Sequence, residues 1–348
     1  MKTQSFVLTI GVVLLSIGIS VGMLSNAQDA SGKGEEMQAA DYRVSGPYTH
    51  DNLTIFLIHG PDRVIGKNFL PLQEALAQKK VVVYETKDVN ELAIENRSAE
   101  DVYVQSGDIV KGGQQDRMMA VDLIVPPKSG RIPIAAFCVE SGRWSGRGTE
   151  QAAVFTSSAD VASAKEIKLA AKVSNSQGEV WKNVSATQDK LSANVGERVN
   201  STVSDSSLQL AVENRKVQQS AESYTNPLSR IIDNKDDVIG YVFAINGRLN
   251  SADVYASSAL FRKLWPKLLK ASAIEAIAEL RKDQKFEPVT EESVRTFLSE
   301  SEKGNASEKE VTARIKLVTR ESDKNVFFET RDRAQKEAWV HRNYIRKD

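Results

Sequence analysis

Residues 238–255 read VIGYVFAINGRLNSADVY, and this stretch decides the fold class. Two runs of β-branched and aromatic residues, Val238–Ile245 and Arg248–Tyr255, flank the dipeptide Asn246-Gly247. An Asn-Gly pair suits the two positive-φ positions of a type I′ turn, which joins antiparallel strands. The stretch therefore predicts a β-hairpin.

A helix is expected directly after the hairpin, over residues 256–282. Leu260, Leu264 and Leu268 recur at the i+4 spacing that places side chains on one face of a helix. Pro266 lies inside this run. Because proline lacks the backbone N–H and clashes with the preceding turn, we expect the helix to be kinked or split there.

The rest of the chain changes character near Gly148. Before this position, runs such as Leu53–His59 and Ile132–Val139 have the composition of buried strands. After it, long segments are rich in helix formers. The sequence therefore predicts an α+β fold with a β-rich N-terminal half, a helical middle, and a C-terminal hairpin followed by a kinked helix. The helices expected in the middle are Ala159–Val173, Gly178–Leu191 and Val203–Ala221.

Residues 1–27 have the pattern of a secretory signal peptide. Lys2 precedes an apolar run over residues 6–24, and the Ser-Asn-Ala sequence of residues 25–27 places small side chains where signal peptidase cleaves. We expect cleavage after Ala27 and an exported protein, either periplasmic or secreted. The alternative is an uncleaved helix that anchors the chain in a membrane, because the apolar run is just long enough to span a bilayer.

The chain after the signal peptide is expected to fall into four parts. Composition separates a flexible polar leader, a main domain, a charged linker around a short helix, and a small C-terminal extension. Their expected ranges are residues 28–41, 42–282, 283–310 and 311–348.

Composition also excludes several classes of function. The chain has 348 residues, with 46 Lys plus Arg and 46 Asp plus Glu, and this balance argues against a dedicated nucleic-acid-binding protein. One cysteine allows no intrachain disulfide, and three histidines leave little material for a metal site. The sequence has no metal-binding spacing, no Rossmann glycine motif and no P-loop. We therefore expect no cofactor, no metal and no nucleic-acid partner.

The first segment with the residues for a binding site is Gln105–Arg117, which reads QSGDIVKGGQQDR. Glycines allow backbone N–H groups to approach a bound anion, and basic side chains add positive charge. The alternative is a glycine turn between two strands with solvated polar residues. The candidate ligand-binding residues of this first segment are Lys111, Gly112, Gly113, Gln114 and Arg117.

The second such segment is Cys138–Gly148, which reads CVESGRWSGRG. The spacing of Cys138 and Arg143 is that of rhodanese-type loops, in which backbone N–H groups and an arginine surround a thiolate. A buried, inert cysteine is the alternative. Arg143 offers a planar fork to an anion, and Trp144 offers a flat face to a ring. Glu140 is a candidate acid or base, or else the salt-bridge partner of Arg143.

Several segments, taken in order, resemble one protein family. They are Leu76–Glu85 (LAQKKVVVYE), Ser106–Arg117 (SGDIVKGGQQDR), Cys138–Trp144 (CVESGRW), Gln177–Trp181 (QGEVW) and Gly240–Phe261. The chain is similar over residues 42–280 to the domain family named for its association with ADP-ribosylglycohydrolase and rhodanese/phosphatase-superfamily proteins. The resemblance implies that the first and second segments form one site. It implies motif positions at Gly107, Gly113, Gln114, Arg117, Glu140, Arg143, Trp144, Gln177 and Trp181.

Three hypotheses of function follow. The first is an exported ligand-binding or interaction module, in which Arg117 and Arg143 hold a small anionic group and Trp144 stacks on a ring. The second is an enzyme on phosphoester or ADP-ribose-type substrates, the reactions suggested by the family's name, with Cys138 as nucleophile or Glu140 as acid or base. The third is a structural envelope protein whose loops are held together by pairing of Glu140 with Arg143.

Overall fold

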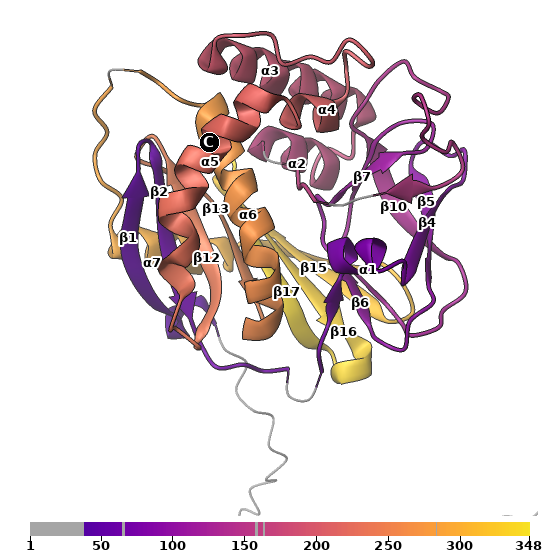
Figure 1. Cartoon of the computed structure of the whole chain (residues 1–348). Helices are drawn as coiled ribbons and strands as arrows, with labels where there is room; N and C mark the ends of the chain where they lie inside the picture. Colours follow the sequence, from indigo (N-terminus) through magenta and orange to yellow (C-terminus); the bar gives the residue numbers. More distant parts are fainter. Residues whose placement is uncertain (1–37, 65–66, 157–158, 163, 283) are drawn as a thin grey trace, which may run out of the picture. The chain divides into compact units, whose positions relative to one another are not determined.

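An eight-stranded antiparallel sheet forms the larger part of the structure (Figure 1). The structure is a computed structural model that describes residues 38–348 except 65–66, 157–158, 163 and 283. The expected signal peptide and most of the expected leader therefore lie outside the described residues. In spatial order the strands of the sheet are β1 (Arg43–His50), β2 (Leu53–His59), β12 (Val238–Ile245), β13 (Arg248–Tyr255), β17 (Ala338–Arg346), β16 (Asn325–Asp332), β15 (Ile315–Glu321) and β14 (Asn305–Glu310).

The hairpin predicted from the sequence is confirmed as β12 and β13. Its two strands have the predicted bounds and pair antiparallel in the middle of the sheet. Asn246 and Gly247 have φ angles of 52° and 71°, as a type I′ turn requires. The local turn chemistry is sufficient to specify this element.

The C-terminal residues are part of the main sheet, whereas the sequence predicted a small extension. β17 pairs with β13, from Ser251 opposite Ile345 to Tyr255 opposite His341. β16 and β15 continue the sheet outward. The expected linker contains the expected short helix, α7 (Glu291–Ser301), and also the exposed edge strand β14. The sequence separated this segment because residues 283–310 are highly charged and contain Pro288 and Gly304, yet the strands that follow them belong to the main sheet.

A smaller β-structure is built from the N-terminal half. Its six strands are ordered β11-β7-β8-β10-β5-β4. Val154, directly before β11, forms a bridge with Tyr84 of β4, so that the sheet curls toward a barrel. The strands are β4 (Val81–Glu85), β5 (Glu91–Asn96), β7 (Ile109–Gly112), β8 (Arg117–Met119), β10 (Ile132–Cys138) and β11 (Phe155–Thr156). A three-stranded sheet of β3 (Leu70–Pro71), β6 (Val102–Val104) and β9 (Leu123–Val125) adjoins it, and α1 (Leu72–Ala77) follows β3.

Helix α6 (Ser258–Ala278) packs on the main sheet against β12 and β13. Leu260, Leu264 and Leu268 are all buried, as the leucine spacing predicted. Pro266 does not split the helix, which runs through it for 21 residues. A proline inside a helix costs about 3 kcal/mol. Burial of each leucine contributes about 1.5–3 kcal/mol, so the packed face outweighs that cost.

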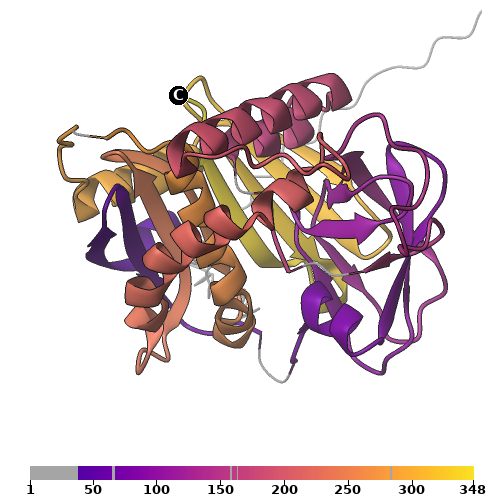
Figure 2. The same ribbon diagram turned by 45° about the horizontal axis from the view of Figure 1, so that its top comes forward.

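Other helices cover α6 and reach the barrel (Figure 2). The helices α2 (Lys165–Lys172) and α3 (Gln177–Val195) confirm two of the three predicted in the middle of the chain. The third is two helices, α4 (Leu208–Val212) and α5 (Arg215–Leu228). The break occurs because the Asn214 side chain caps α5 by accepting hydrogen bonds from its first N–H groups. α3 contacts both α6 and β10, and so connects the two β-structures.

Candidate functional site

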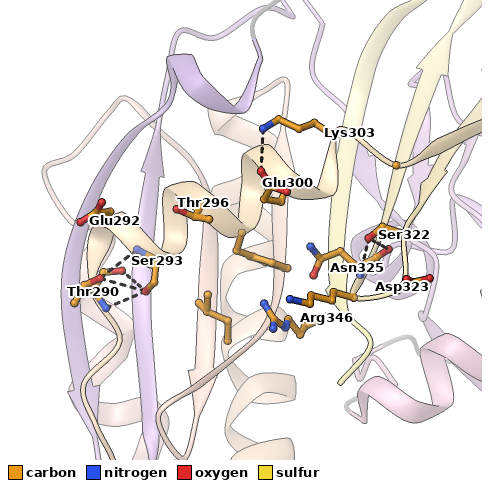
Figure 3. Close-up of a pocket in the computed structure, with 14 residues that line it drawn as sticks. Thr290, Glu292, Ser293, Thr296, Glu300, Lys303, Ser322, Asp323, Asn325 and Arg346 are labelled. Carbon is orange, nitrogen blue, oxygen red and sulfur yellow. Dashed lines mark hydrogen bonds and ion pairs between the residues drawn. The ribbon is translucent and has the colours of Figure 1, made fainter.

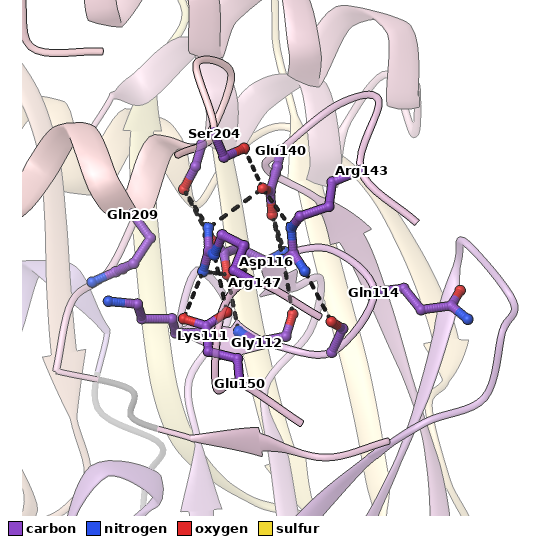
Figure 4. A network of polar contacts seen from close by, with 12 residues as sticks. Lys111, Gly112, Gln114, Asp116, Glu140, Arg143, Arg147, Glu150, Ser204 and Gln209 are labelled. Atoms are coloured by element: carbon purple, nitrogen blue, oxygen red, sulfur yellow. Dashed lines mark hydrogen bonds and ion pairs between the residues drawn. The ribbon is translucent and has the colours of Figure 1, made fainter. Parts of the chain in front are cut away.

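Arg143 is bound by groups of the protein itself (Figure 4). Its Nε and Nη2 donate to the two carboxylate oxygens of Glu140, each at 2.7 Å. Nη1 donates to the carbonyl oxygen of Gly113 at 3.0 Å and Nη2 to that of Gly112 at 3.1 Å. Nη1 also donates to the carbonyl of Ser145. The arginine of the second segment thus ties that segment to the glycines of the first.

Arg147 makes a second buried ion pair beside the first. Its Nη1 and Nη2 donate to the two carboxylate oxygens of Asp116, at 2.8 and 2.7 Å, and its Nε donates to Glu150 at 2.9 Å. Sequence reasoning did not select Arg147 or Asp116. The two residues are far apart in the chain, so no local spacing indicates their pairing. We refer to Asp116, Glu140, Arg143 and Arg147 together as the clasp.

The two carboxylates of the clasp are also bound by uncharged donors. Glu140 accepts the backbone N–H of Asp116 at 2.8 Å and the hydroxyl of Ser204. Burial raises the pKa of Glu140, but hydrogen bonds from Arg143 and Ser204 outweigh it, and the pKa lies below its ordinary value. Burial raises the pKa of Asp116 despite its hydrogen bond from Arg147. With two acidic and two basic side chains, the clasp has no excess charge to attract an anion.

Helix α3 fixes the end of strand β10, from which the second segment begins. The side-chain amide of Gln177 accepts the N–H of Cys138 and donates to the carbonyl of the same residue, both at 2.8 Å. The indole N–H of Trp181 donates to the carbonyl oxygen of Glu140 at 3.0 Å. Gln177 and Trp181 are motif positions implied by the family resemblance, and both act here on the backbone of the second segment.

Arg117 does not join Arg143, although the sequence predicted that both hold one anion. Arg117 is fully buried. It donates to the carbonyl oxygen of Val89 at 2.7 Å and to Glu85 at 3.2 Å. Asp116, directly before β8 (Arg117–Met119), is bound by Arg147 of the clasp, so the two neighbouring residues take part in different contacts. The structure therefore does not bring the two predicted arginines together around one position.

The other candidates of the first segment have local roles. Lys111 pairs with Glu213 at 2.6 Å, and the side chain of Gln114 points away from the clasp (Figure 4). Gly112 and Gly113 have φ angles of 116° and 57°, which favour glycine. A Cβ on Gly113 would lie 2.3 Å from the ring of Phe155. The glycine-turn alternative accounts for these two residues.

Cys138 lacks the surroundings of a rhodanese-type thiolate. The residue is fully buried, and its Sγ lies 3.8 Å from the carbonyl oxygen of Val89. Burial raises the pKa of the thiol to about 11, although the nearby charge of Arg117 lowers it. The guanidinium of Arg143 is bound to Glu140 instead. The buried, inert cysteine proposed as the alternative fits this geometry.

Trp144 remains exposed in the same segment whose arginines are engaged. Its exposed fraction is 52%, and that of Val203 is 68%. Within the described part of the chain, these are the exposed large apolar side chains. Ser204, the neighbour of Val203, donates to Glu140, and Ser206 accepts the N–H of Ser141 at 3.0 Å. The loops that carry the two apolar side chains are therefore fastened to each other.

A second buried polar cluster surrounds His341 on β17. Its Nδ1 lies 2.8 Å from Asp122 and its Nε2 lies 3.1 Å from Asp253. Burial lowers the pKa of His341, but the two carboxylates outweigh it and raise the pKa to about 9. Beside it is a cavity of about 20 Å³, lined in part by Lys172 and Gln105. This volume suits a water molecule, not a substrate.

The described residues contain neither a cluster of metal ligands nor a membrane-spanning helix. No group of His, Cys, Asp and Glu among them has the arrangement of a metal site. No described helix combines the length and the apolar character that crossing a membrane requires.

The comparisons with known proteins identify a family. Neither a curated protein nor a solved structure matches the chain. The family model of the ARG and Rhodanese-Phosphatase-superfamily-associated Protein domain matches residues 41–345. The match covers the C-terminal strands β14 to β17 as well as the clasp. The chain therefore belongs to the family of ARG and Rhodanese-Phosphatase-superfamily-associated Protein domains.

Proposed function

We propose that this protein is an exported interaction module that presents Trp144 to a protein partner, and not a thiol enzyme. One observation carries the proposal. The charged side chains of the second segment are hydrogen-bonded within the protein as part of the clasp, whereas Trp144, in the middle of that segment, is 52% exposed. A large aromatic side chain on a fixed loop is typical of protein interfaces.

The clasp supplies the rigidity that such a contact needs. Arg143 and Arg147, on either side of Trp144, each hold a carboxylate with two hydrogen bonds. A loop fixed in this way loses little conformational entropy when a partner binds. Because the clasp is neutral as a whole, the contact is expected to rest on Trp144 and Val203 and not on charge.

The enzyme hypothesis has less support from the geometry. The Cys138 thiol is protonated at neutral pH, because its pKa is raised to about 11. Glu140 accepts hydrogen bonds from Arg143, Ser204 and the N–H of Asp116, so its oxygens are occupied. The structural hypothesis explains the Glu140–Arg143 pair but leaves the exposed tryptophan without a role.

Site-specific photo-crosslinking in the producing cell tests the proposal. A benzophenone amino acid is placed at position 144 in one strain and at position 309, on the exposed edge strand β14, in another. We expect a discrete crosslinked species from position 144 that is absent from position 309 and is lost when Val203 is changed to Asp. The same products from both positions, or no product from position 144, would refute the proposed interface.

A further inference from the structure

A groove lies between helix α7 and the ends of the neighbouring strands (Figure 3). Its volume is about 790 Å³, within the range of pockets that hold small molecules. Among the residues that line the groove are Leu249, Phe297, Glu300, Lys324, Asn325 and Arg346. It shares no residue with the clasp.

Asn325 supplies a buried acceptor that faces this groove. The residue is 4% exposed, and its Oδ1 has no hydrogen-bond partner among the described residues. The backbone of Asn325 is held by Ser322, whose hydroxyl accepts its N–H at 3.1 Å and whose N–H donates to its carbonyl at 2.9 Å. The side chain is directed into the groove toward Arg346 (Figure 3). A buried amide oxygen without a donor is unfavourable, and a ligand hydroxyl would supply that donor.

Positive charge lies beside this acceptor. The side chain of Lys324 lines the groove and has no hydrogen bond or ion pair among the described residues, whereas its backbone carbonyl accepts the N–H of Lys347 at 2.8 Å. Arg346 binds Asp348 through Nε and through Nη2, the latter at 3.1 Å. The lining as a whole is balanced, because Glu292, Glu300 and Asp323 offset Lys303, Lys324 and Arg346. Lys303 is paired with Glu300 at 2.9 Å and Arg346 with Asp348, so among the described residues of this lining Lys324 is the cation without a bound carboxylate. Its ammonium group, beside the guanidinium of Arg346, suits an anionic group of a ligand.

The remaining lining suits a sugar. The hydroxyls of Thr296 and Ser322 and the carboxylate of Glu300 exchange hydrogen bonds with hydroxyl groups, and Phe297 and Leu249 offer apolar surface to a ring. A second hollow of about 570 Å³ shares Leu249, Ser293 and Arg346 with the first, so the depression continues past Arg346. A ligand of more than one ring matches this length.

We infer that the groove binds an acidic oligosaccharide. Its anionic group contacts Lys324 and Arg346, and a hydroxyl donates to Asn325 Oδ1. The anion is either a uronate carboxylate or a sugar phosphate, which present the same chemistry to these two cations. An extended peptide is less well matched, because the described residues of the lining include only two large apolar side chains, Leu249 and Phe297, and no strand edge.

Binding is measured by ¹H–¹⁵N NMR titration, with the Asn325 side-chain amide as the reporter. The probes are trigalacturonate, glucose 6-phosphate, neutral maltotriose and triglutamate. We expect an acidic sugar to move the Asn325 signals and to bind about tenfold more tightly than maltotriose. Tighter binding of trigalacturonate identifies a uronate ligand, whereas tighter binding of glucose 6-phosphate identifies a phosphate ligand.

Two variants locate the site, with a third as the control. Lys324→Ala removes an exposed cation and is expected to weaken acidic-sugar binding about tenfold. Asn325→Asp places a negative charge beside the bound anion and is expected to abolish binding. Lys309→Ala removes an exposed lysine outside the groove and is expected to change nothing. The inference is overturned if Lys324→Ala binds like Lys309→Ala, if maltotriose binds as tightly as both acidic sugars, or if triglutamate binds more tightly than either.

Discussion

The guanidinium of Arg147 binds both carboxylate oxygens of Asp116, at 2.8 and 2.7 Å, although the two residues are 31 positions apart. This pair joins the glycine turn of the first segment to the far end of the second. Side-chain exposures of 4% and 0% place it out of solvent. Breaking a buried pair of this kind leaves a buried charge uncompensated, so the pair has a predictable effect on stability.

Arg147→Met is expected to lower the free energy of unfolding by about 3–5 kcal/mol, because Asp116 then loses its partner inside the protein. Arg198→Ala is the matched control. Arg198 and Asp205 form an ion pair on the surface, with side-chain exposures of 70% and 68%. Arg198→Ala is expected to change the free energy of unfolding by less than about 1 kcal/mol. Urea denaturation of both variants makes the comparison, and equal losses would show that the clasp has no special role.

Gly113→Ala and Gly142→Ala separate backbone strain from steric conflict. Both glycines have positive φ angles, 57° and 79°. An alanine in this conformation costs about 1–2 kcal/mol. Only at Gly113 does the new Cβ meet the ring of Phe155, whereas nothing lies within 4 Å at Gly142. Thermal unfolding is expected to show that Gly113→Ala lowers the free energy of unfolding by about 1–3 kcal/mol more than Gly142→Ala does. Equal losses would mean that the Phe155 ring moves aside without cost.

The Cys138 thiol is expected to react slowly with a disulfide reagent at pH 7 in the folded protein. The thiol is buried and its pKa is raised to about 11, so little thiolate is present and the reagent has no access. In denaturant the same thiol is expected to have reacted fully by the time of the first measurement. Similar rates in the two conditions would contradict the buried, inert assignment and favour the enzyme hypothesis.

His341 makes stability depend on pH in a defined direction. Its folded pKa, about 9, lies above its unfolded value near 6.5. Its contribution to the free energy of unfolding is therefore complete below pH 6.5 and is lost as the pH rises through 9. Between pH 6.5 and 8 the loss amounts to about 2 kcal/mol.

A His341→Gln variant isolates this contribution. Glu275, with a pKa raised to about 7, and Lys172, with a pKa lowered to about 8, also titrate in the folded protein near this range. Subtracting the pH profile of the variant from that of the unaltered protein removes most of their effect. A difference between the two unfolding free energies that stays constant from pH 6.5 to 8 would contradict the raised pKa.

The sequence was informative wherever the deciding interactions are local. The Asn246-Gly247 turn and the stripe of Leu260, Leu264 and Leu268 depend on neighbouring residues, and both are confirmed. Glu140 and Arg143 are three residues apart, and their pairing was the alternative to an acid or base role for Glu140. The family resemblance also implied that the first and second segments form one site.

Other features depend on contacts between distant residues. Arg147 and Asp116 are brought into contact only by the tertiary fold. The face toward which Arg117 points depends on the register of a three-residue strand. The C-terminal strands bury polar residues such as His341 and Arg342 in pairs with distant partners. Their composition therefore resembles that of a surface segment, although they are part of the main sheet.

The arginine Nε–Hε NMR signals of the folded protein test the central claim, that the clasp is closed by the protein's own carboxylates. Inorganic phosphate is added at rising concentration while the Arg143 signal is followed. Because Arg143 holds Glu140 through two hydrogen bonds of 2.7 Å, we predict that its Nε–Hε signal does not shift. A saturable shift of the Arg143 signal with phosphate would show that the clasp opens to an anion and would contradict this account.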